Sequence, residues 1–282
     1  MSESNTAPVD ANEAAQGSAN KWLALAAMMF AVSMMFIDQT IVSSAIPTIQ
    51  TELGLSEAGV QWVINGYLLS LSAFFALGGR LSDILGHKRM VLLGVTIFAV
   101  SSALCGATPD NSFAEAWLIV FRIIQGIGAA LLFPAALASV VSTFPLEEPG
   151  KALALFFGIT GGLTAIGPIM GGYLSEWTWR AIFWVNVPEA IIAIVLTLLA
   201  KVHTQHKREP LDYLGAVLIA AGMAFSVLGL QQASSWGWTD PRTIGSIVLG
   251  LILLAIFVKV ETRVKIPLIK VEIFKDRAFF VD

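Results

Sequence analysis

Asp38 is a carboxylate inside a long apolar stretch of the chain. If a membrane-spanning helix starts at Trp22, Asp38 lies about 24 Å along its axis. A charged side chain at that depth is costly and usually faces a polar cavity. Asp38 is therefore either a group that handles protons or faces substrate, or a structural polar contact. We expect no other acid in a neighbouring span, and Thr40 is a candidate for lining the same cavity.

Arg122 is the one cation that falls within an apolar run, and Gln125 follows it. Because arginine keeps its charge, it needs a carboxylate, backbone carbonyls or water as a partner. Gln125, three residues later, shares the same helix face and is a second cavity-lining candidate. Arg122 is thus either a charge partner that tunes a nearby acid or a structural side chain bound to backbone. The sequence leaves open whether it meets Asp38.

Glycines crowd residues 158–172, where Gly167 is followed by Pro168, and Gly171 by Gly172. Small residues of this kind allow helices to pack closely, and close packing alone would explain them. The Gly-Pro pair also removes a backbone hydrogen bond and predicts a kinked helix. A kinked, glycine-lined helix suits a moving gate.

A short polar segment, residues 79–89, separates two long apolar runs. We interpret it as a cytoplasmic loop between two membrane-spanning helices. Its candidate functional residues are Gly79, Asp83, Gly86, Lys88 and Arg89.

The apolar runs are the elements that must position these side chains. The chain has 282 residues, of which 56% are hydrophobic and only 13% charged, whereas soluble domains are about 25% charged. Runs of about 20 apolar residues are long enough to cross a bilayer as helices. The sequence therefore predicts an all-α, polytopic membrane protein with eight spans, at about 22–46, 59–79, 90–107, 115–137, 151–174, 181–200, 212–232 and 242–260.

Basic residues predict the orientation, because cytoplasmic loops carry an excess of Lys and Arg. With the N-terminus in the cytoplasm, the outer loops hold only Arg180 and Arg242. Nearly all other cations then lie inside: Lys21, Arg80, Lys88, Arg89, Lys151, Lys201, Lys207, Arg208, Lys259, Arg263, Lys265, Lys270, Lys275 and Arg277. We therefore expect a multi-pass protein of the cell (plasma or inner) membrane with a cytoplasmic N-terminus.

An internal repeat points to transport. Residues 78–83 resemble residues 171–176, and each copy ends a predicted span. Three spans separate the copies, so they face opposite sides of the membrane. Inverted repeats are typical of secondary transporters, although a chance match in a Gly- and Leu-rich chain would look the same.

Five motifs, in order along the chain, resemble those of a known family: residues 38–47, 79–89, 122–128, 167–172 and 179–188. The chain resembles the major facilitator superfamily, and within it the 14-helix drug:proton antiporters of the EmrB/QacA type. Residues 211–215 also fit the 14-helix branch. The pattern departs from the family at Ser43, Ile84, His87 and Ala181.

The resemblance implies a six-helix transporter bundle over residues 21–200 and two linking spans over 201–260. A disordered cytoplasmic tail (1–20) would precede them, and a basic cytoplasmic segment (261–282), with the possible start of a ninth helix, would follow. It also implies proton-coupled efflux of small amphipathic or cationic compounds, with Asp38 and Arg122 coupling transport to protons. The alternatives are export of a specific metabolite or lipid, and an inactive or scaffolding truncated membrane protein.

The implied partners are membrane lipid and small-molecule substrates, without nucleic acid. Protons would be the coupling ion, and we expect no other cofactor and no enzyme activity. The three histidines, His87, His203 and His206, lie in predicted loops without a cluster of ligands, so we expect no metal site. Because such transporters have two bundles, we expect a fragment that lacks its C-terminal bundle or associates with itself.

Overall fold

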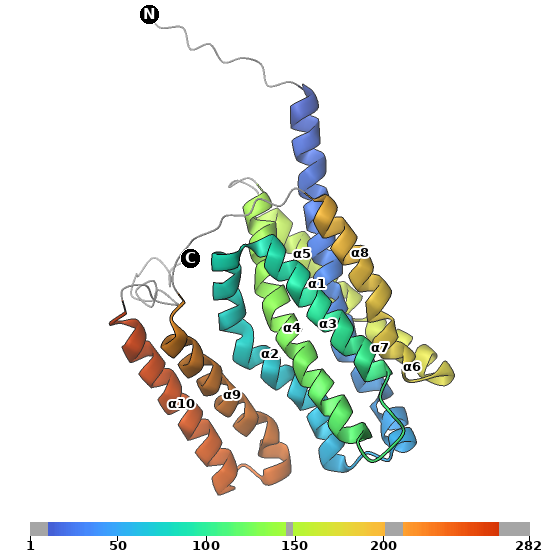
Figure 1. Cartoon of the computed structure of the whole chain (residues 1–282), viewed down its shortest axis with the longest axis vertical. Coiled ribbons are helices and arrows are strands. Elements are labelled where there is room, and N and C mark those ends of the chain that lie inside the picture. The colour runs from blue at the N-terminus through green and yellow to red at the C-terminus, as the bar shows by residue number, and fades with distance from the viewer. Residues whose placement is uncertain (1–10, 145–148, 201–210, 265–282) are drawn as a thin grey trace, which may run out of the picture.

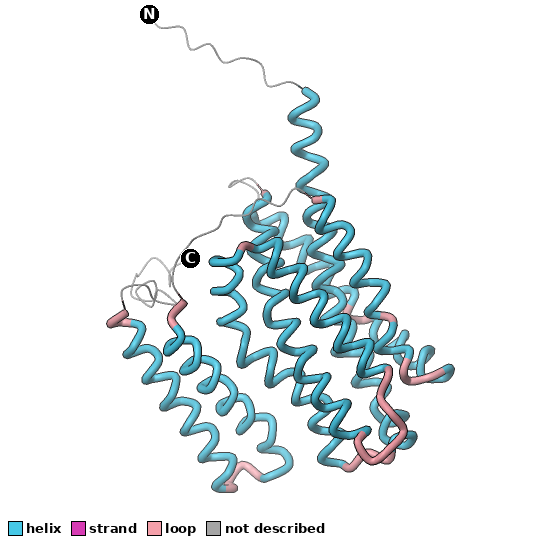
Figure 2. Tube along the Cα trace, in the orientation of Figure 1, coloured by secondary structure: helices cyan, strands magenta, loops and turns pink. Residues whose placement is uncertain are grey.

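The computed structural model describes residues 11–144, 149–200 and 211–264 of the chain. Throughout these ranges the regular secondary structure is helical, which confirms the predicted all-α fold (Figure 2). The helices are α1 (Ala11–Leu53), α2 (Glu57–Leu85), α3 (His87–Gly106), α4 (Ala114–Thr143), α5 (Pro149–Leu163), α6 (Ile166–Trp177), α7 (Ala181–Trp184), α8 (Asn186–Leu199), α9 (Tyr213–Trp236) and α10 (Pro241–Glu261).

Eight membrane-length spans lie within the described residues, as the apolar runs predict. Two of these spans are built from two helices each. The span Gly150–Trp177 contains α5 and α6, and the span Ala181–Leu199 contains α7 and α8. The chain therefore has the helices of a multi-pass membrane protein.

The bundle is organised around α1 and α4. Helix α4 packs against α2 and α3, while α1 packs against α6 and α8 and also contacts α4. Helices α9 and α10 pair with each other and reach the other helices through α2 (Figure 1). The six spans up to α8 thus form one bundle, beside which α9 and α10 stand as a hairpin.

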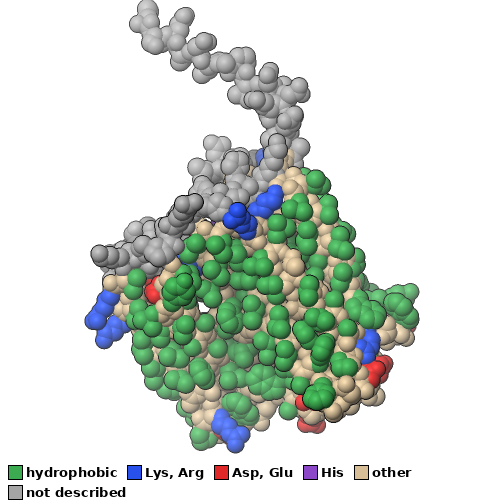
Figure 3. Space-filling model, viewed as in Figure 1, with side chains coloured by type: hydrophobic (Ala, Val, Ile, Leu, Met, Phe, Trp, Pro, Cys, Tyr) green, Lys and Arg blue, Asp and Glu red, His purple; other side chains and the backbone are tan. Residues whose placement is uncertain are grey.

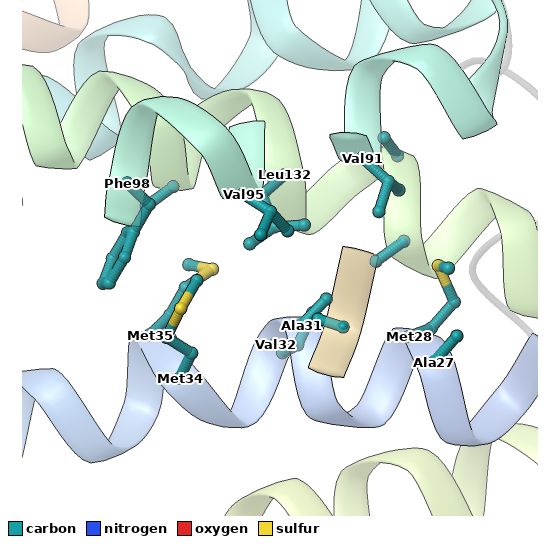
Figure 4. Packing of buried hydrophobic residues seen from close by; sticks show 14 of the residues in the cluster. Ala27, Met28, Ala31, Val32, Met34, Met35, Val91, Val95, Phe98 and Leu132 are labelled. Atoms are coloured by element: carbon teal, nitrogen blue, oxygen red, sulfur yellow. The ribbon is translucent and has the colours of Figure 1, made fainter. Parts of the chain in front are cut away.

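Apolar side chains of α1, α3 and α4 fill the centre of this bundle. In Figure 4, Met28, Val32 and Met35 lie along α1 on the side of Val91 and Val95 of α3. All five are buried. Their packing fixes the rotation of α1 and so determines where its polar residues point.

The outer surface is also largely hydrophobic. Figure 3 shows apolar side chains covering the middle of the visible face, with the basic and acidic side chains near its two ends. Large residues such as Ile169, Leu199 and Leu251 are more than half exposed. Helices with apolar outer faces of this kind are suited to hydrocarbon rather than water.

The start of α1 differs from the expected disordered tail. Helix α1 begins at Ala11, so residues 11–20 are helical, while residues 1–10 lie outside the described part of the chain. The segment contains Ala11, Glu13, Ala14 and Ala15, and these are strong helix formers. Residues 265–282, including the possible start of a ninth helix, also lie outside the described residues.

Candidate functional site

Asp38 and Arg122 form an ion pair in the interior of the bundle. Arg122 Nη1 on α4 lies 2.6 Å from Asp38 Oδ2 on α1. Both side chains are almost completely buried. The packing of α1 against α4 therefore settles the question left open by the sequence, because these two side chains meet.

Two amides complete the surroundings of Asp38. Gln125 Nε2 and Asn186 Nδ2 each donate to Asp38 Oδ1 over 2.9 Å. Gln125 Oε1 in turn accepts from Arg122 Nη1 over 2.8 Å. Both carboxylate oxygens thus accept hydrogen bonds, and none of the three donating nitrogens can accept a proton.

The same network ties Arg122 to α2. Arg122 Nε donates to the carbonyl oxygen of Val63 over 3.1 Å, and its guanidinium carbon lies 4.4 Å from the centre of the Tyr67 ring. On the other side, Asn186 Nδ2 donates to Ser102 Oγ of α3, and that hydroxyl donates to Phe183 O. The hydrogen-bond network around this charge pair thereby connects α1, α2, α3, α4 and α8.

This arrangement can respond chemically to a proton. A buried ion pair is held in place by its partner charge and by its hydrogen bonds, so removing one charge leaves the other uncompensated. Protonation of Asp38 would remove its charge and weaken its own contacts with α4 and α8, which lie at the centre of a network of five helices. The site could therefore convert proton binding into a change of helix packing.

Thr40 lies at a break between α5 and α6. Pro168 has no backbone N–H and so cannot bond to the carbonyl oxygen of Thr164, four residues earlier. The Thr40 hydroxyl lies 3.1 Å from this Thr164 oxygen, with the Ile37 carbonyl as an alternative acceptor. The expected kink is present, and the Thr164 carbonyl oxygen lies within hydrogen-bond distance of both the Thr40 hydroxyl and the Gly167 backbone N–H, at 3.1 and 3.3 Å.

The glycines of residues 167–172 differ in what surrounds them. A Cβ at Gly167 would collide with Thr40 Oγ1 and approach the Ile37 carbonyl, and a Cβ at Gly171 would collide with Ser44 Oγ. These two glycines let α6 lie against α1. Gly172 is exposed, and a Cβ there would meet nothing within 4 Å among the described residues.

The predicted loop over residues 79–89 is largely helical, so its interpretation as a loop was wrong. Helix α2 continues to Leu85 and α3 begins at His87, which leaves Gly86 as the connection. Gly86 has φ of 96°, a conformation that favours glycine. Gly79 and Asp83 therefore lie on the last turns of α2, while Lys88 and Arg89 lie on the first turn of α3.

Lys88 connects this junction to α8. Its Nζ donates to the carbonyl oxygens of Leu198 and Ala200, at 3.1 and 2.9 Å. A cation at a helix C-terminus satisfies free carbonyls and interacts favourably with the helix dipole. Asn186, at the other end of α8, is about 18 Å away along the helix axis. The junction residues therefore lie apart from the Asp38 network, and Asp83 and Arg89 are exposed.

Sequence reasoning missed Asn186 and Glu189, which both lie on α8. The expectation that no neighbouring span holds another acid was wrong, because Glu189 falls within the span Ala181–Leu199. Its Oε1 accepts a hydrogen bond from Ser33 Oγ of α1 over 2.7 Å. A polar and an acidic residue inside an apolar run were the signals that could have identified them. Among the described residues, no group of three His, Cys, Asp or Glu side chains could hold a metal ion.

The sequence is similar to those of proteins named for drug resistance and export. The chain is 38% identical over 257 residues to the "Tetracenomycin C resistance and export protein" of Streptomyces glaucescens, covering 90% of the chain and 47% of that protein. It is 35% identical over 265 residues to the "Puromycin resistance protein pur8" of Streptomyces alboniger, covering 93% and 52%. The chain thus spans about half the length of the curated relatives it matches.

Solved structures support the fold. A peptide transporter of the type named POT, an E310Q mutant with sulfate, aligns with a TM-score of 0.59 at 17% identity, covering 87% of this chain and 52% of that one. A bacterial homologue of the lysosomal transporter Spinster, inward-facing and unoccupied, aligns with a TM-score of 0.52 at 19% identity, covering 84% and 60%.

A family profile covers most of the chain. It is described as "Major Facilitator Superfamily" and matches residues 28–259, from α1 to near the end of α10. The matched region includes the Asp38 network and both helices of the α9–α10 hairpin. The chain belongs to the Major Facilitator Superfamily.

Proposed function

We propose that this chain acts in proton-coupled efflux of small amphipathic or cationic compounds. The observation that carries the proposal is the buried Asp38–Arg122 ion pair, which joins two central helices of the bundle. The names of the relatives support it, since they describe resistance to, and export of, antibiotics. The chain would then be a transporter component rather than an enzyme.

Proton binding at Asp38 would drive the cycle. Neutralising Asp38 frees Arg122 and both amides, which favours a second arrangement of α1 against α4 and α8. Each proton that crosses the membrane supplies about 2.3 kcal/mol per 100 mV of potential. Deprotonation restores the closed network found in the structure.

The transporting unit would include a second bundle. Transporters of this class bind substrate between two repeats and move one against the other. We propose that the opposite wall comes from a C-terminal bundle such as the longer relatives have room for, or from a second copy of the chain. The unit would lie in the cell membrane, with the N-terminus of α1 in the cytoplasm.

Efflux of a dye from cells or vesicles under an imposed pH gradient tests the proposal. In the transporter that carries this chain, Asp38→Asn should abolish uncoupler-sensitive efflux. An exposed acid of the same helix, Glu52, supplies the control, because Glu52→Gln should leave efflux unchanged. Undiminished efflux by Asp38→Asn over a series of pH values would remove Asp38 from the mechanism.

A further inference from the structure

A second carboxylate, Glu189, lies near the Asp38 network but in a different environment. Glu189 belongs to α8 and is only partly buried, whereas Asp38 is fully buried. Its Oε1 accepts from the hydroxyl of Ser33 on α1 over 2.7 Å. Of the two acids at the α1–α8 interface, Glu189 is therefore the one that is partly exposed in this conformation.

The hydrogen bonds of the two acids differ in kind. Asp38 accepts from a guanidinium and two amide nitrogens, and none of these donor atoms can accept a proton. Glu189 faces a hydroxyl, which can both donate and accept. Ser33 Oγ also lies 3.0 Å from the Phe30 carbonyl oxygen, so its proton has a second acceptor.

This hydroxyl suits both protonation states of Glu189. With Glu189 ionised, Ser33 donates to the carboxylate. With Glu189 protonated, the carboxyl O–H donates to Ser33 Oγ, and Ser33 donates to Phe30 instead. The contact survives either way, so a proton can come and go at Glu189 without leaving a buried polar atom unpaired.

Glu189 is also linked to Asp38 through short stretches of two helices. Asn186, which donates to Asp38, precedes Glu189 by three residues on α8. Ser33 precedes Asp38 by five residues, or about 7.5 Å along α1. A change of charge at Glu189 would therefore affect Asp38 electrostatically and through the two connecting helices.

The other helices packed against α8 bring little charge to this place. Helix α8 contacts α1, α3 and α7. From α1, Asp38 is the nearby charge, with Arg122 behind it. Helix α3 carries its charged residues at His87–Arg89, and Lys88 there reaches the far end of α8. Its thiol, Cys105, lies beyond Ser102, and α7 contains no ionisable side chain.

We propose that Glu189 is a second proton-carrying group of this transporter, which exchanges its proton with water while Asp38 remains paired with Arg122. The inference rests on the proposed proton coupling. In the step itself a proton from water joins a Glu189 carboxylate oxygen, and the side chain goes from one negative charge to none. Protonation of Glu189 thus removes the repulsion between the two acids, and Asp38 responds to this loss.

Labelling with dicyclohexylcarbodiimide tests the site in residues 1–282, purified in detergent or nanodiscs. This apolar reagent adds the O–H of a protonated carboxyl across its C=N bond, and the product rearranges to a stable N-acylurea. Mass spectrometry at neutral pH should find the adduct at Glu189, and labelling should fall as the pH rises. Asp38 should stay unlabelled, as should exposed Glu52, because an exposed glutamate is ionised at neutral pH.

Two variants sharpen the result. Glu189→Gln should lose the adduct. Ser33→Ala should keep it and extend labelling to higher pH, because the ionised carboxylate has lost its donor. Protection of buried Cys105 from maleimide checks in each case that the bundle is folded. No adduct at Glu189 in folded wild-type protein, or an equal adduct at Glu52, would overturn the proposal.

Transport separates this inference from the proposed function. Where Asp38→Asn abolishes efflux, Glu189→Gln should retain efflux but flatten its dependence on pH. A Glu189→Gln profile that superimposes on the wild type would overturn the role of Glu189 and leave the role of Asp38 intact. Efflux retained by Asp38→Asn would instead refute the proposed function, and the labelling experiment would still decide whether Glu189 binds a proton.

Discussion

The replacement Asp38→Asn should destabilise the folded bundle as well as affect transport. The carboxylate oxygens of Asp38 only accept hydrogen bonds, but asparagine replaces one of them with an NH₂ donor. At the Oδ1 position this NH₂ would face Gln125 Nε2 and Asn186 Nδ2, and at the Oδ2 position it would face Arg122. In either orientation donor meets donor, and Arg122 keeps a buried charge without its counter-charge.

The expected size follows from the burial of the pair. Removing one partner of a buried ion pair costs about 3–5 kcal/mol. For a chain of this length each kcal/mol lowers Tm by about 2–4 °C, so the variant should melt roughly 6–20 °C below the wild type. Cys105 provides the assay, since it is the single cysteine and is buried. A thiol-reactive fluorophore will report the temperature at which the bundle opens.

A second replacement tests the electrostatic reasoning directly. Arg122→Gln alone should also destabilise, because it leaves Asp38 as an unpaired buried charge. The double variant Asp38→Asn/Arg122→Gln removes both charges, and it should be more stable than the sum of the single losses by about 0.5–3 kcal/mol. The reasoning is refuted if Asp38→Asn melts within a degree or so of the wild type, or if the two losses simply add.

Two further predictions concern α6 and the orientation. Gly167→Ala should cost about 1–3 kcal/mol by overpacking, because its Cβ collides with Thr40 Oγ1, whereas the matched variant Gly172→Ala should not lower Tm. Equal melting of the two variants by the Cys105 assay would contradict the packing of α6 on α1. For orientation, Asn111→Cys in a Cys105→Ser background should react with an impermeant maleimide added outside intact cells, and Arg89→Cys should not. Labelling of position 89 from outside would reverse the topology.

Much of the fold was predictable because hydropathy alone constrains it. Eight apolar runs predicted eight spans, and the structure has them in the described residues. Asp38 and Arg122 could also be singled out, since a charge within an apolar run is conspicuous. Their pairing could not, because the two residues are 84 positions apart and meet only when the packing of α1 against α4 fixes the rotation of both helices.

The polar segment over residues 79–89 was predicted less well. Charged residues between two apolar runs suggested a loop, but Asp83, Lys88 and Arg89 are all helical. Helices remain favourable outside the hydrocarbon, where charged side chains can reach water. Polarity therefore did not mark where the helix ends, whereas Gly86, with its positive φ, did.

The break between α5 and α6 gives this span the mechanics of a lever. Gly167 and Gly171 let α6 lie along α1, and at the break the Thr40 hydroxyl lies 3.1 Å from the Thr164 carbonyl oxygen. Helix α5 packs less closely on α1 and has 15 residues, so it is about 22 Å long. A tilt of about 10° at the break moves the far end of α5 by about 4 Å. Such a displacement is comparable to the length of a side chain, and it would not require α6 to move from α1.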